Sequence, residues 1–351
     1  MPFMNDTPLT PMDLPATATD TSLTRRDFIV QTSALAAAGV ALGSLGDAEA
    51  AQPAKAAADP ELDIAEWSFF WLGVKRAELA RGTVINGAQA YVEYQIPARV
   101  RHPYPIVIIH GGGWINGDKR LKRPPLAPFL DRGISVAAIN YRLVPQHPLP
   151  APVHDAARAI QFLRWKGETL GIDPDRIGLT GTSAGACTSM WLLLHDDLAD
   201  PTAADPVLRA STRVRAAAVS VGQTSIDPDV IESWLGPAVL DHPMIFGAVG
   251  ESSMAEVRAE ADRHRAIYEE FSPINHVDGD DPPLFMACSA EMDLPARNSG
   301  HGIHHPLHGV KLKDRSDAVG HECHLFVPGW SETKRYADGT DFLLDKLLSL
   351  E

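Results

Sequence analysis

The sequence predicts an α/β fold with a mostly parallel central sheet, helices on both of its faces and a modest cap insertion. Three observations lead to this prediction. Apolar runs of strand length alternate with segments of helical periodicity along most of the chain. Several of these runs are continuous and rich in β-branched residues, which is typical of strands buried on both faces. One apolar run also enters a tight turn, Gly181-Thr-Ser-Ala-Gly185, and a helical pattern follows it at once.

Composition and charge restrict the class of partner. The chain has 351 residues and is 45% hydrophobic, so it is long enough to bury a large core. Its formal net charge is −14 at pH 7, and it has no basic runs. An acidic surface argues against nucleic acid or anionic lipid as a partner. A small neutral substrate suits this chain better, and the oligomeric state is not predicted.

The first 50 residues resemble a twin-arginine export signal. Arg25 and Arg26 precede a weakly apolar run at 29–45, and Ala48-Glu-Ala50 offers an A-x-A cleavage site. The run contains polar residues and is shorter than the ~20 strongly apolar residues that a membrane span needs. A disordered tail and a membrane anchor are the alternatives. We therefore expect a periplasmic or secreted protein that is not inserted in a membrane after cleavage.

The remainder is expected to form a flexible lead-in at 51–62 and one domain at 63–351. The aromatic cluster at 67–71 is interpreted as a helix that packs on the domain, with a flap over the substrate pocket as the alternative. Alternation at 90–96 indicates an antiparallel strand. Apolar runs predict further strands, and helical spacing predicts helices. Expected strands lie at 105–109, 134–143, 177–180, 215–221, 282–288 and 322–328, and expected helices at 153–165, 186–195, 311–319 and 338–350.

A long stretch at about 224–281 separates two of the expected strands. It carries mixed helical patterns, and connections of this length have structure of their own or serve a function. We expect it to form a cap over the site. Two of the three cysteines, Cys288 and Cys323, lie on the last two expected strands. The sequence does not decide whether they form a disulfide.

The turn around Ser183 has the form Gly-x-Ser-x-Gly between a strand and a helix, which is the context of a nucleophile elbow. The residues two before and two after the serine crowd each other in such a turn. Glycine, which lacks Cβ, fits there at low cost. The serine hydroxyl then stands at the carboxyl edge of the sheet, and the next helix points its amino end at the site.

A second motif, His110-Gly-Gly-Gly-Trp114, follows the strand at 105–109. Three glycines let the backbone approach a ligand and direct amide N–H groups at one spot, which is what an oxyanion hole requires. A simple glycine turn is the alternative. His110 is not expected to be catalytic. Its ring is expected to brace the loop through hydrogen bonds.

These motifs together resemble those of α/β-hydrolase esterases, in particular the branch similar to hormone-sensitive lipase and to bacterial feruloyl and acetyl esterases. The resemblance implies that Ser183 is the nucleophile, that the amides of Gly111, Gly112 and Ala184 form the oxyanion hole and that Asp293 is the triad acid. Glu291 is a less well placed rival. No cofactor is implied. The motifs that carry the resemblance are His110–Trp114, Asn140–Leu143, Gly171–Ile177, Gly181–Gly185 and Ser272–His276.

The catalytic histidine departs from the pattern of that family. The family places it after the last strand, but no histidine follows the strand expected at 322–328. His324 would sit within that strand, too low in the sheet to reach Ser183, unless the strand is shorter, in which case His324 or His321 becomes possible. The segment at 301–308 holds four other histidines and should lie at the catalytic edge. We favour His304, with His305 and His324 as alternatives.

Metal binding by those four histidines is not expected. The pairs His301/His305 and His304/His308 have i, i+4 spacing, but Gly302 and Pro306 argue against a helix that would align them. The sequence therefore predicts a serine hydrolase that cleaves a carboxylic ester of a small to medium substrate through an acyl-enzyme. The alternatives are a catalytically impaired relative that binds a ligand, and a formamidase or peptidase of the same fold. An imidazole within about 3.2 Å of the Ser183 hydroxyl would distinguish an active enzyme from an impaired one.

Overall fold

The computed structural model describes residues 64–71, 91–97, 101–119, 127–331 and 335–349. All of them fall in one compact unit, residues 60–351. The predicted export signal, residues 1–50, and the lead-in at 51–62 lie outside the described residues. Within the described ranges, no helix is both long and apolar enough to cross a membrane.

Among the described residues, the central sheet has eight strands in the order β1-β2-β4-β3-β5-β6-β7-β8. The six strands from β4 to β8 in this order run parallel to one another, and each connection from β3 onward contains a helix, as a parallel crossover requires. β2 joins β4 in antiparallel orientation, as the alternating pattern at 90–96 predicts. The predicted mostly parallel sheet is therefore confirmed. The strands are β1 (Ile64–Trp71), β2 (Tyr91–Pro97), β3 (His102–Ile109), β4 (Ile134–Asn140), β5 (Gly178–Thr182), β6 (Ala216–Ser220), β7 (Leu284–Ala287) and β8 (Cys323–Phe326).

The aromatic cluster at 67–71 forms a strand, so its interpretation as a helix is wrong. It belongs to β1, which pairs antiparallel with β2 from Ile64↔Pro97 to Trp71↔Tyr91. Aromatic residues favour strands over helices. The antiparallel β2 also offers β1 a ladder of backbone hydrogen bonds. A strand partner this distant along the chain cannot be recognised from local spacing.

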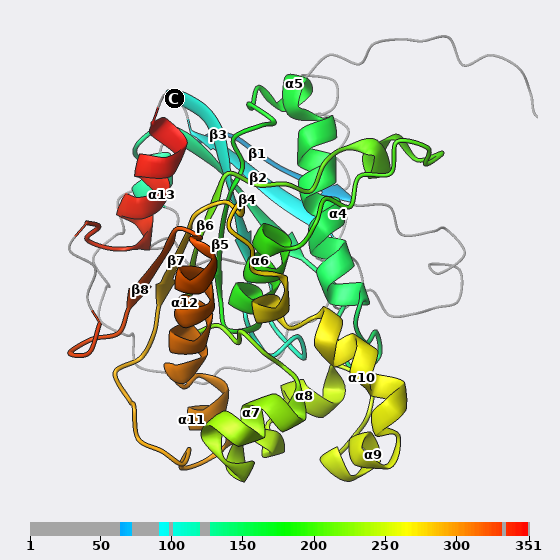
Figure 1. Cartoon of the computed structure of the whole chain (residues 1–351). Helices are drawn as coiled ribbons and strands as arrows, with labels where there is room; N and C mark the ends of the chain where they lie inside the picture. The colour runs from blue at the N-terminus through cyan, green and yellow to red at the C-terminus, as the bar shows by residue number, and fades with distance from the viewer. Residues whose placement is uncertain (1–63, 72–90, 98–100, 120–126, 332–334, 350–351) are drawn as a thin grey trace, which may run out of the picture. The chain divides into compact units, whose positions relative to one another are not determined.

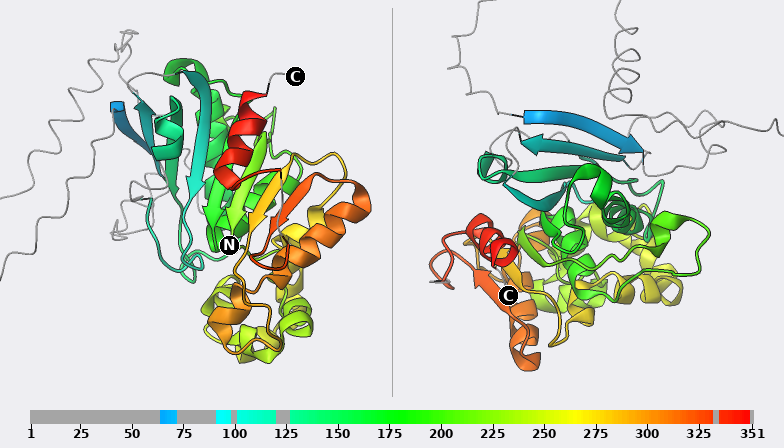
Figure 2. Two further views of the ribbon diagram at one scale, coloured as in Figure 1. Left: turned by 90° about the vertical axis from the view of Figure 1, so that its left-hand side faces the viewer. Right: turned by 90° about the horizontal axis from the view of Figure 1, so that it is seen from above.

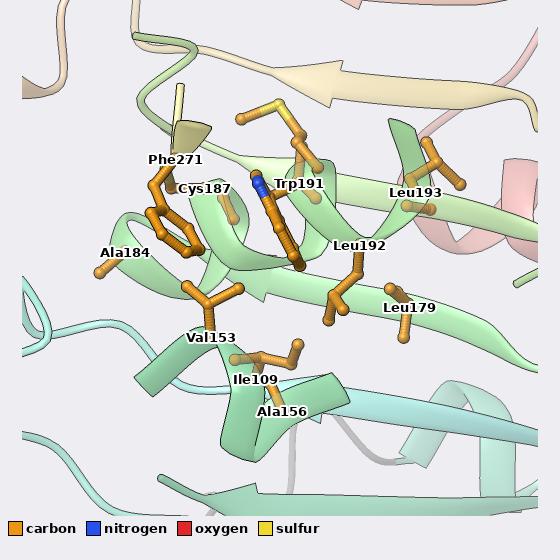
Figure 3. Packing of buried hydrophobic residues seen from close by; sticks show 14 of the residues in the cluster. Ile109, Val153, Ala156, Leu179, Ala184, Cys187, Trp191, Leu192, Leu193 and Phe271 are labelled. Carbon is orange, nitrogen blue, oxygen red and sulfur yellow. The ribbon is translucent and has the colours of Figure 1, made fainter. Parts of the chain in front are cut away.

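Helices cover both faces of the sheet, and each face has its own apolar cluster (Figures 1 and 2). The larger cluster contains residues of α4, α6 and α12, and the smaller one residues of α3 and α13. Trp191 of α6 lies in the larger cluster among Val153, Leu192 and Phe271 (Figure 3). These helices are α3 (Ala127–Leu130), α4 (Ala151–Trp165), α6 (Ala184–Leu194), α12 (Leu307–Val319) and α13 (Gly339–Leu348), and a short α5 (Gly167–Leu170) follows α4.

The long connection between β6 and β7 is helical. Its helices gather with α11 beyond one end of the sheet (Figure 1). The segment η2 packs directly on α11, since a Cβ placed on Gly302 would lie only 2.7 Å from Cβ of Val239. The connection holds α7 (Pro228–Leu235), η2 (Pro237–Asp241), α8 (Pro243–Gly247), α9 (Met254–Ala259), α10 (Ala261–Glu270) and η3 (Pro273–His276), and the shorter η1 (Pro206–Arg209) precedes β6.

The segment between β7 and β8 carries two helices, α11 (Ser299–Ile303) and α12. The helix expected at 311–319 therefore begins earlier, at Leu307. Cys288 and Cys323 are both free. The register pairs Cys323 with Leu284, and Cys288 follows the last residue of β7, so the two cysteines are offset by four residues along the strands, roughly 13 Å at the rise of a strand. A disulfide between the two cysteines is thus excluded by the sheet register.

Candidate active site

The turn after β5 stores backbone strain at the serine itself. Ser183 has φ 55° and ψ −123°, a conformation that L-residues seldom adopt and that costs about 1–3 kcal/mol. Neither flanking glycine takes a positive φ. They are required for space instead, because a Cβ on Gly181 would lie 2.4 Å from the Gly185 carbonyl oxygen. A Cβ on Gly185 would lie 2.1 Å from the Ile109 carbonyl oxygen. The glycines allow the close approach, and Ser183 bears the strained angle.

The glycine loop after β3 packs against this turn. A Cβ on Gly111 would lie 2.6 Å from the Thr182 carbonyl oxygen and 3.4 Å from Cβ of Ser183. Gly112 has φ 103°, and its carbonyl oxygen accepts hydrogen bonds from the amides of Ile115 and Asn116. The loop therefore curls back on itself beside Ser183. Ala184 is the first residue of α6, where amide N–H groups have no partner inside the helix.

Buried aromatic side chains hold the glycine loop in place. The His110 ring stacks on Tyr141 at 4.2 Å between centroids, and its Nδ1 donates to the Gly111 carbonyl oxygen at 2.8 Å. The Tyr141 hydroxyl donates to the His110 carbonyl oxygen at 2.7 Å. Trp114, which is fully buried, donates from Nε1 to Oγ1 of Thr188 at 2.9 Å. His110 thus braces the loop, as predicted from the sequence.

Ser183 and His304 lie in direct contact. Oγ of Ser183 is 2.8 Å from Nε2 of His304, although 121 residues separate them in sequence. Nδ1 of His304 is 3.2 Å from the Gly300 carbonyl oxygen. A carbonyl oxygen can only accept, so Nδ1 carries the proton and Nε2 offers its lone pair to the serine hydroxyl. Burial lowers the pKa of His304 below its ordinary value of 6.5, which keeps this ring neutral.

The short helix α11 sets the position of His304. The Asn298 side chain caps its amino end by accepting from the His301 amide at 2.8 Å, and His304 is its C-cap residue. On either side of His304, His301 donates to the Glu291 carbonyl oxygen and His305 to the Asp293 carbonyl oxygen, both at 3.2 Å. These bonds tie α11 to the loop that follows β7.

Asp293 does not reach His304, which corrects its assignment as the triad acid. Its side chain is 79% exposed, and its carboxylate pairs with Arg297 at 3.5 Å. The rival Glu291 also pairs with Arg297 and is more than half exposed. The physical reason is that hydrogen bonds to the backbone hold the segment after β7 close to α11. Because the backbone carbonyls of both acids accept from histidine rings, their side chains turn away toward Arg297, and a backbone carbonyl takes the place of the acid beside His304.

The other candidate histidines lie elsewhere. His305 is buried, and both of its ring nitrogens are bonded to the chain, since Nδ1 accepts from the Leu307 amide at 3.0 Å. His324 lies within β8, 3.0 Å from a Glu322 carboxylate oxygen, and packs on Phe342 of α13. His321 bonds to Ser316 and to the Pro282 carbonyl oxygen. None of the three contacts Ser183, and the strand argument against His324 is confirmed.

Sequence reasoning missed His242. Its ring lies 6.4 Å from that of His304 and 3.5 Å from the Cβ position of Gly113, so it borders both the histidine and the glycine loop. Nδ1 caps α8 by accepting from the Met244 amide at 3.2 Å, which leaves the proton on Nε2. Burial, reinforced by nearby His304, lowers the pKa of His242 to about 4. The only local signal was a capping residue before a proline.

A serine on a strained turn after β5, a glycine loop after β3 and a histidine at the same sheet edge define the chain as an α/β-hydrolase. It belongs to the BD-FAE family, whose model matches residues 92–294, more than half of the chain. The fold and the resemblance predicted from the sequence are thereby confirmed.

Two curated relatives, both ester hydrolases by name, agree with this family. The chain is 31% identical over 179 residues to the probable carboxylic ester hydrolase LipM of Mycobacterium tuberculosis. The aligned region covers 51% of this chain and 38% of LipM. It is 32% identical over 165 residues to the carboxylesterase NlhH of the same organism, covering 42% of this chain and 51% of NlhH. The chain thus spans about half or less of the relatives it matches.

The solved structures support the fold alone. The acetyl ester-xyloside bifunctional hydrolase of Caldicellulosiruptor lactoaceticus superimposes with a TM-score of 0.57 and 22% identity, over 76% of this chain and 87% of that one. A truncated carbohydrate esterase from gut microbiota gives the same TM-score and identity, over 74% of this chain and 91% of that one.

Proposed function

We propose that this protein is a carboxylic ester hydrolase that works through an acyl-enzyme formed on Ser183. The observation that carries the proposal is the 2.8 Å contact between Oγ of Ser183 and Nε2 of His304. It meets the distance expected for a nucleophile and its general base. The same contact argues against a catalytically impaired relative, which would lack such an imidazole. The names of LipM and NlhH describe those proteins as ester hydrolases.

The mechanism follows from the placement of the protons. Nε2 of His304 takes the hydroxyl proton of Ser183 as Oγ attacks the ester carbonyl. The amides of Gly111, Gly112 and Ala184 then stabilise the oxyanion, aided by the amino end of α6. His304 returns the proton to the leaving alcohol, and water releases the acyl group by the same steps. The Gly300 carbonyl oxygen, 3.2 Å from Nδ1, orients the ring and stabilises the imidazolium.

We expect the substrate to be a small to medium, uncharged and partly apolar ester. A neutral His242 borders the site, and the net charge of −14 disfavours anionic substrates. A Cβ on Gly113 of the glycine loop would have His242, Ile115 and Met244 as its nearest neighbours, each at 3.5 Å. An acetylated or aryl ester would fit this environment, and a charged acyl group would not.

Labelling and hydrolysis of the purified protein test the proposal. A fluorophosphonate probe and p-nitrophenyl acetate should both react rapidly, and both reactions should be lost in Ser183→Ala. The matched control is Ser233→Ala, which removes an exposed hydroxyl of α7 that bonds only to the Val230 carbonyl oxygen. A folded protein that neither labels nor hydrolyses any ester would reject the proposal in favour of a ligand-binding relative.

The pH dependence of hydrolysis should have an acid limb with a midpoint below 6.5. His304 must be neutral to accept the serine proton, and burial lowers its pKa below 6.5. Activity should therefore rise as the pH increases through this lowered pKa and persist below pH 6.5. The profile of kcat/KM between pH 4 and pH 8 checks this expectation, and a midpoint above 6.5 would contradict it.

The same pH series needs a control for unfolding. Burial lowers the pKa of His308 to about 3, so His308 is neutral in the folded protein. Its contribution to stability is present above pH 6.5 and declines as the pH falls toward 3. Circular dichroism at each pH separates this loss of stability from protonation of His304.

His242→Asn should lower kcat/KM about 10-fold with little loss of stability. Asparagine keeps a side-chain oxygen to cap α8, but it removes the imidazole N–H beside His304. A neutral hydrogen bond to bound substrate contributes about 0.5–1.5 kcal/mol. His242→Ala, which loses the cap as well, should in addition lower the melting temperature. Unchanged kinetics in His242→Asn would assign His242 to the cap alone.

We also propose that the protein is exported through the twin-arginine route to the periplasm or the medium. Arg25 and Arg26, the weakly apolar run that follows them and the Ala48–Ala50 cleavage site support this proposal. Export of a folded protein would also agree with its free cysteines, since folding before export leaves no need for a disulfide.

A further inference from the structure

A second cluster of chemically active side chains lies at the opposite end of α6 from Ser183. His195 is the C-cap residue of α6, Glu270 ends α10 and His276 ends η3. One potential ligand atom from each of the three lies within 4.8 Å of the others. α6 has 11 residues, so the cluster is roughly 18 Å from Ser183 at 1.5 Å per residue. It therefore takes no part in ester hydrolysis.

The contacts of His195 place a ring lone pair beside a carboxylate. Nδ1 is 2.8 Å from the Asp196 carbonyl oxygen, which can only accept, so Nδ1 carries the proton. Nε2 is 3.0 Å from a carboxylate oxygen of Glu270. In a neutral ring Nε2 holds a lone pair, and two electron-rich atoms at this distance repel each other. A proton shared between the two atoms, or a metal ion bound by both, removes this repulsion.

His276 shows the same division of roles between its two ring nitrogens. Nε2 is 2.6 Å from the Glu270 carbonyl oxygen and must donate to it. Nδ1 is then left with the lone pair. Both rings thus use one nitrogen to bond a backbone carbonyl and keep the other as a potential ligand. This arrangement is typical of histidines that bind metal ions, because the outer bond fixes the tautomer and the ring orientation.

Trp191 holds the cluster in shape. Its ring, which is 1% exposed, stacks on His195 at 4.2 Å and on Phe271 at 5.2 Å between centroids. Its Nε1 donates to the same Glu270 carbonyl oxygen at 2.8 Å. Figure 3 shows Trp191 and Phe271 side by side within the apolar cluster. The ligand residues are therefore positioned by the core, which lowers the entropic cost of binding an ion.

We propose that His195, Glu270 and His276 bind a divalent transition metal ion, with Zn²⁺ as the best match. Two imidazoles and one carboxylate form a typical zinc ligand set, and water completes the coordination at this partly exposed site. A tetrahedral ion with bonds of about 2.1 Å separates its ligands by about 3.4 Å, so the 3.0 Å pair needs to open only slightly. The ion would join the end of α6 to the connection between β6 and β7.

A second group of possible ligands among the described residues fits less well. It consists of Glu251, Glu260 and His264, so it offers a single imidazole. The Glu260 carboxylate is already paired with Arg263. This group therefore serves as an internal comparison for the proposed site.

Zinc titration of the full chain, purified and stripped with EDTA, tests the proposal. Calorimetry should detect one tightly bound equivalent of Zn²⁺, and the melting temperature should rise with zinc concentration. Glu270→Gln keeps the shape and the backbone contacts but removes the carboxylate, and it should weaken binding by about 100-fold or more. His276→Gln should have a similar effect. Glu251→Gln, in the comparison group, should bind Zn²⁺ like the original protein.

Two outcomes would overturn the proposal. One is the absence of stoichiometric binding, with the ring of His195 observed by NMR as an imidazolium at neutral pH, which would assign a proton to the gap between His195 and Glu270. The other is zinc binding that Glu270→Gln and His276→Gln leave unchanged. Ester hydrolysis should survive EDTA treatment in either case, so this test is independent of the catalytic proposal.

Discussion

His304→Gln is expected to lower kcat/KM by about 10³-fold or more, whereas Asp293→Asn should lower it by less than about 10-fold. Nε2 of His304 is the base that contacts Ser183 at 2.8 Å, and glutamine cannot accept the proton. The Asp293 carboxylate is instead 79% exposed and paired with Arg297. Its loss should therefore leave the orientation of His304 unchanged, because the Gly300 carbonyl oxygen supplies that orientation.

Steady-state kinetics of both variants with one activated ester decide this point. His324→Gln is a matched control, since His324, like His304, is a partly buried histidine. It lies in β8 beside the Glu322 carboxylate and does not contact Ser183. It should keep nearly full activity. If Asp293→Asn lost as much activity as His304→Gln, the aspartate would have to contact His304 during turnover, and the assignment of a backbone acceptor would be wrong.

Gly185→Ala is expected to destabilise the protein by more than about 4 kcal/mol, or to prevent folding. The added Cβ would lie 2.1 Å from the Ile109 carbonyl oxygen and 2.6 Å from that of His110. Both are backbone atoms at the end of β3, so a side-chain rotation cannot relieve the overlap. The whole helix α6 would have to move away from the sheet, and the serine and the glycine loop would separate.

Thermal or urea unfolding measures this effect, with Gly320→Ala as the control. Gly320 has φ 81°, and a Cβ there would meet nothing within 4 Å. Its replacement costs only the left-handed backbone strain of about 1–2 kcal/mol. The comparison therefore separates steric overlap from backbone strain. Equal stability of the two variants would show that α6 can move from β3 at little cost.

The location of the strain at the elbow has a consequence for catalysis. Ser183 has φ 55°, while the flanking glycines carry ordinary angles. The packing of α6 against β3 holds the serine in this conformation, because only glycine at 181 and 185 permits the approach. The serine oxygen is thus placed against Nε2 of His304 before substrate binds. Preorganisation of this kind reduces the rearrangement needed in the transition state.

The local features of this protein were determined by its sequence. Continuous apolar runs identified the parallel strands, and helical spacing identified α4, α6 and α13. The Gly-x-Ser-x-Gly turn identified Ser183, and three consecutive glycines after β3 identified the loop beside it. Each of these inferences depends on contacts between residues that are near in sequence, such as the crowding of Gly181 and Gly185, and such contacts can be deduced from spacing.

Only the tertiary structure decided how distant segments meet. Ser183 and His304 are 121 residues apart, and their contact depends on how α11 packs against η2. The turning of Asp293 toward Arg297, the approach of His242 and the grouping of His195, Glu270 and His276 arise in the same way. The physical reason is that spacing fixes the face of a helix or strand on which a residue lies. Packing between elements decides which side chains from distant segments come within a few ångströms of one another.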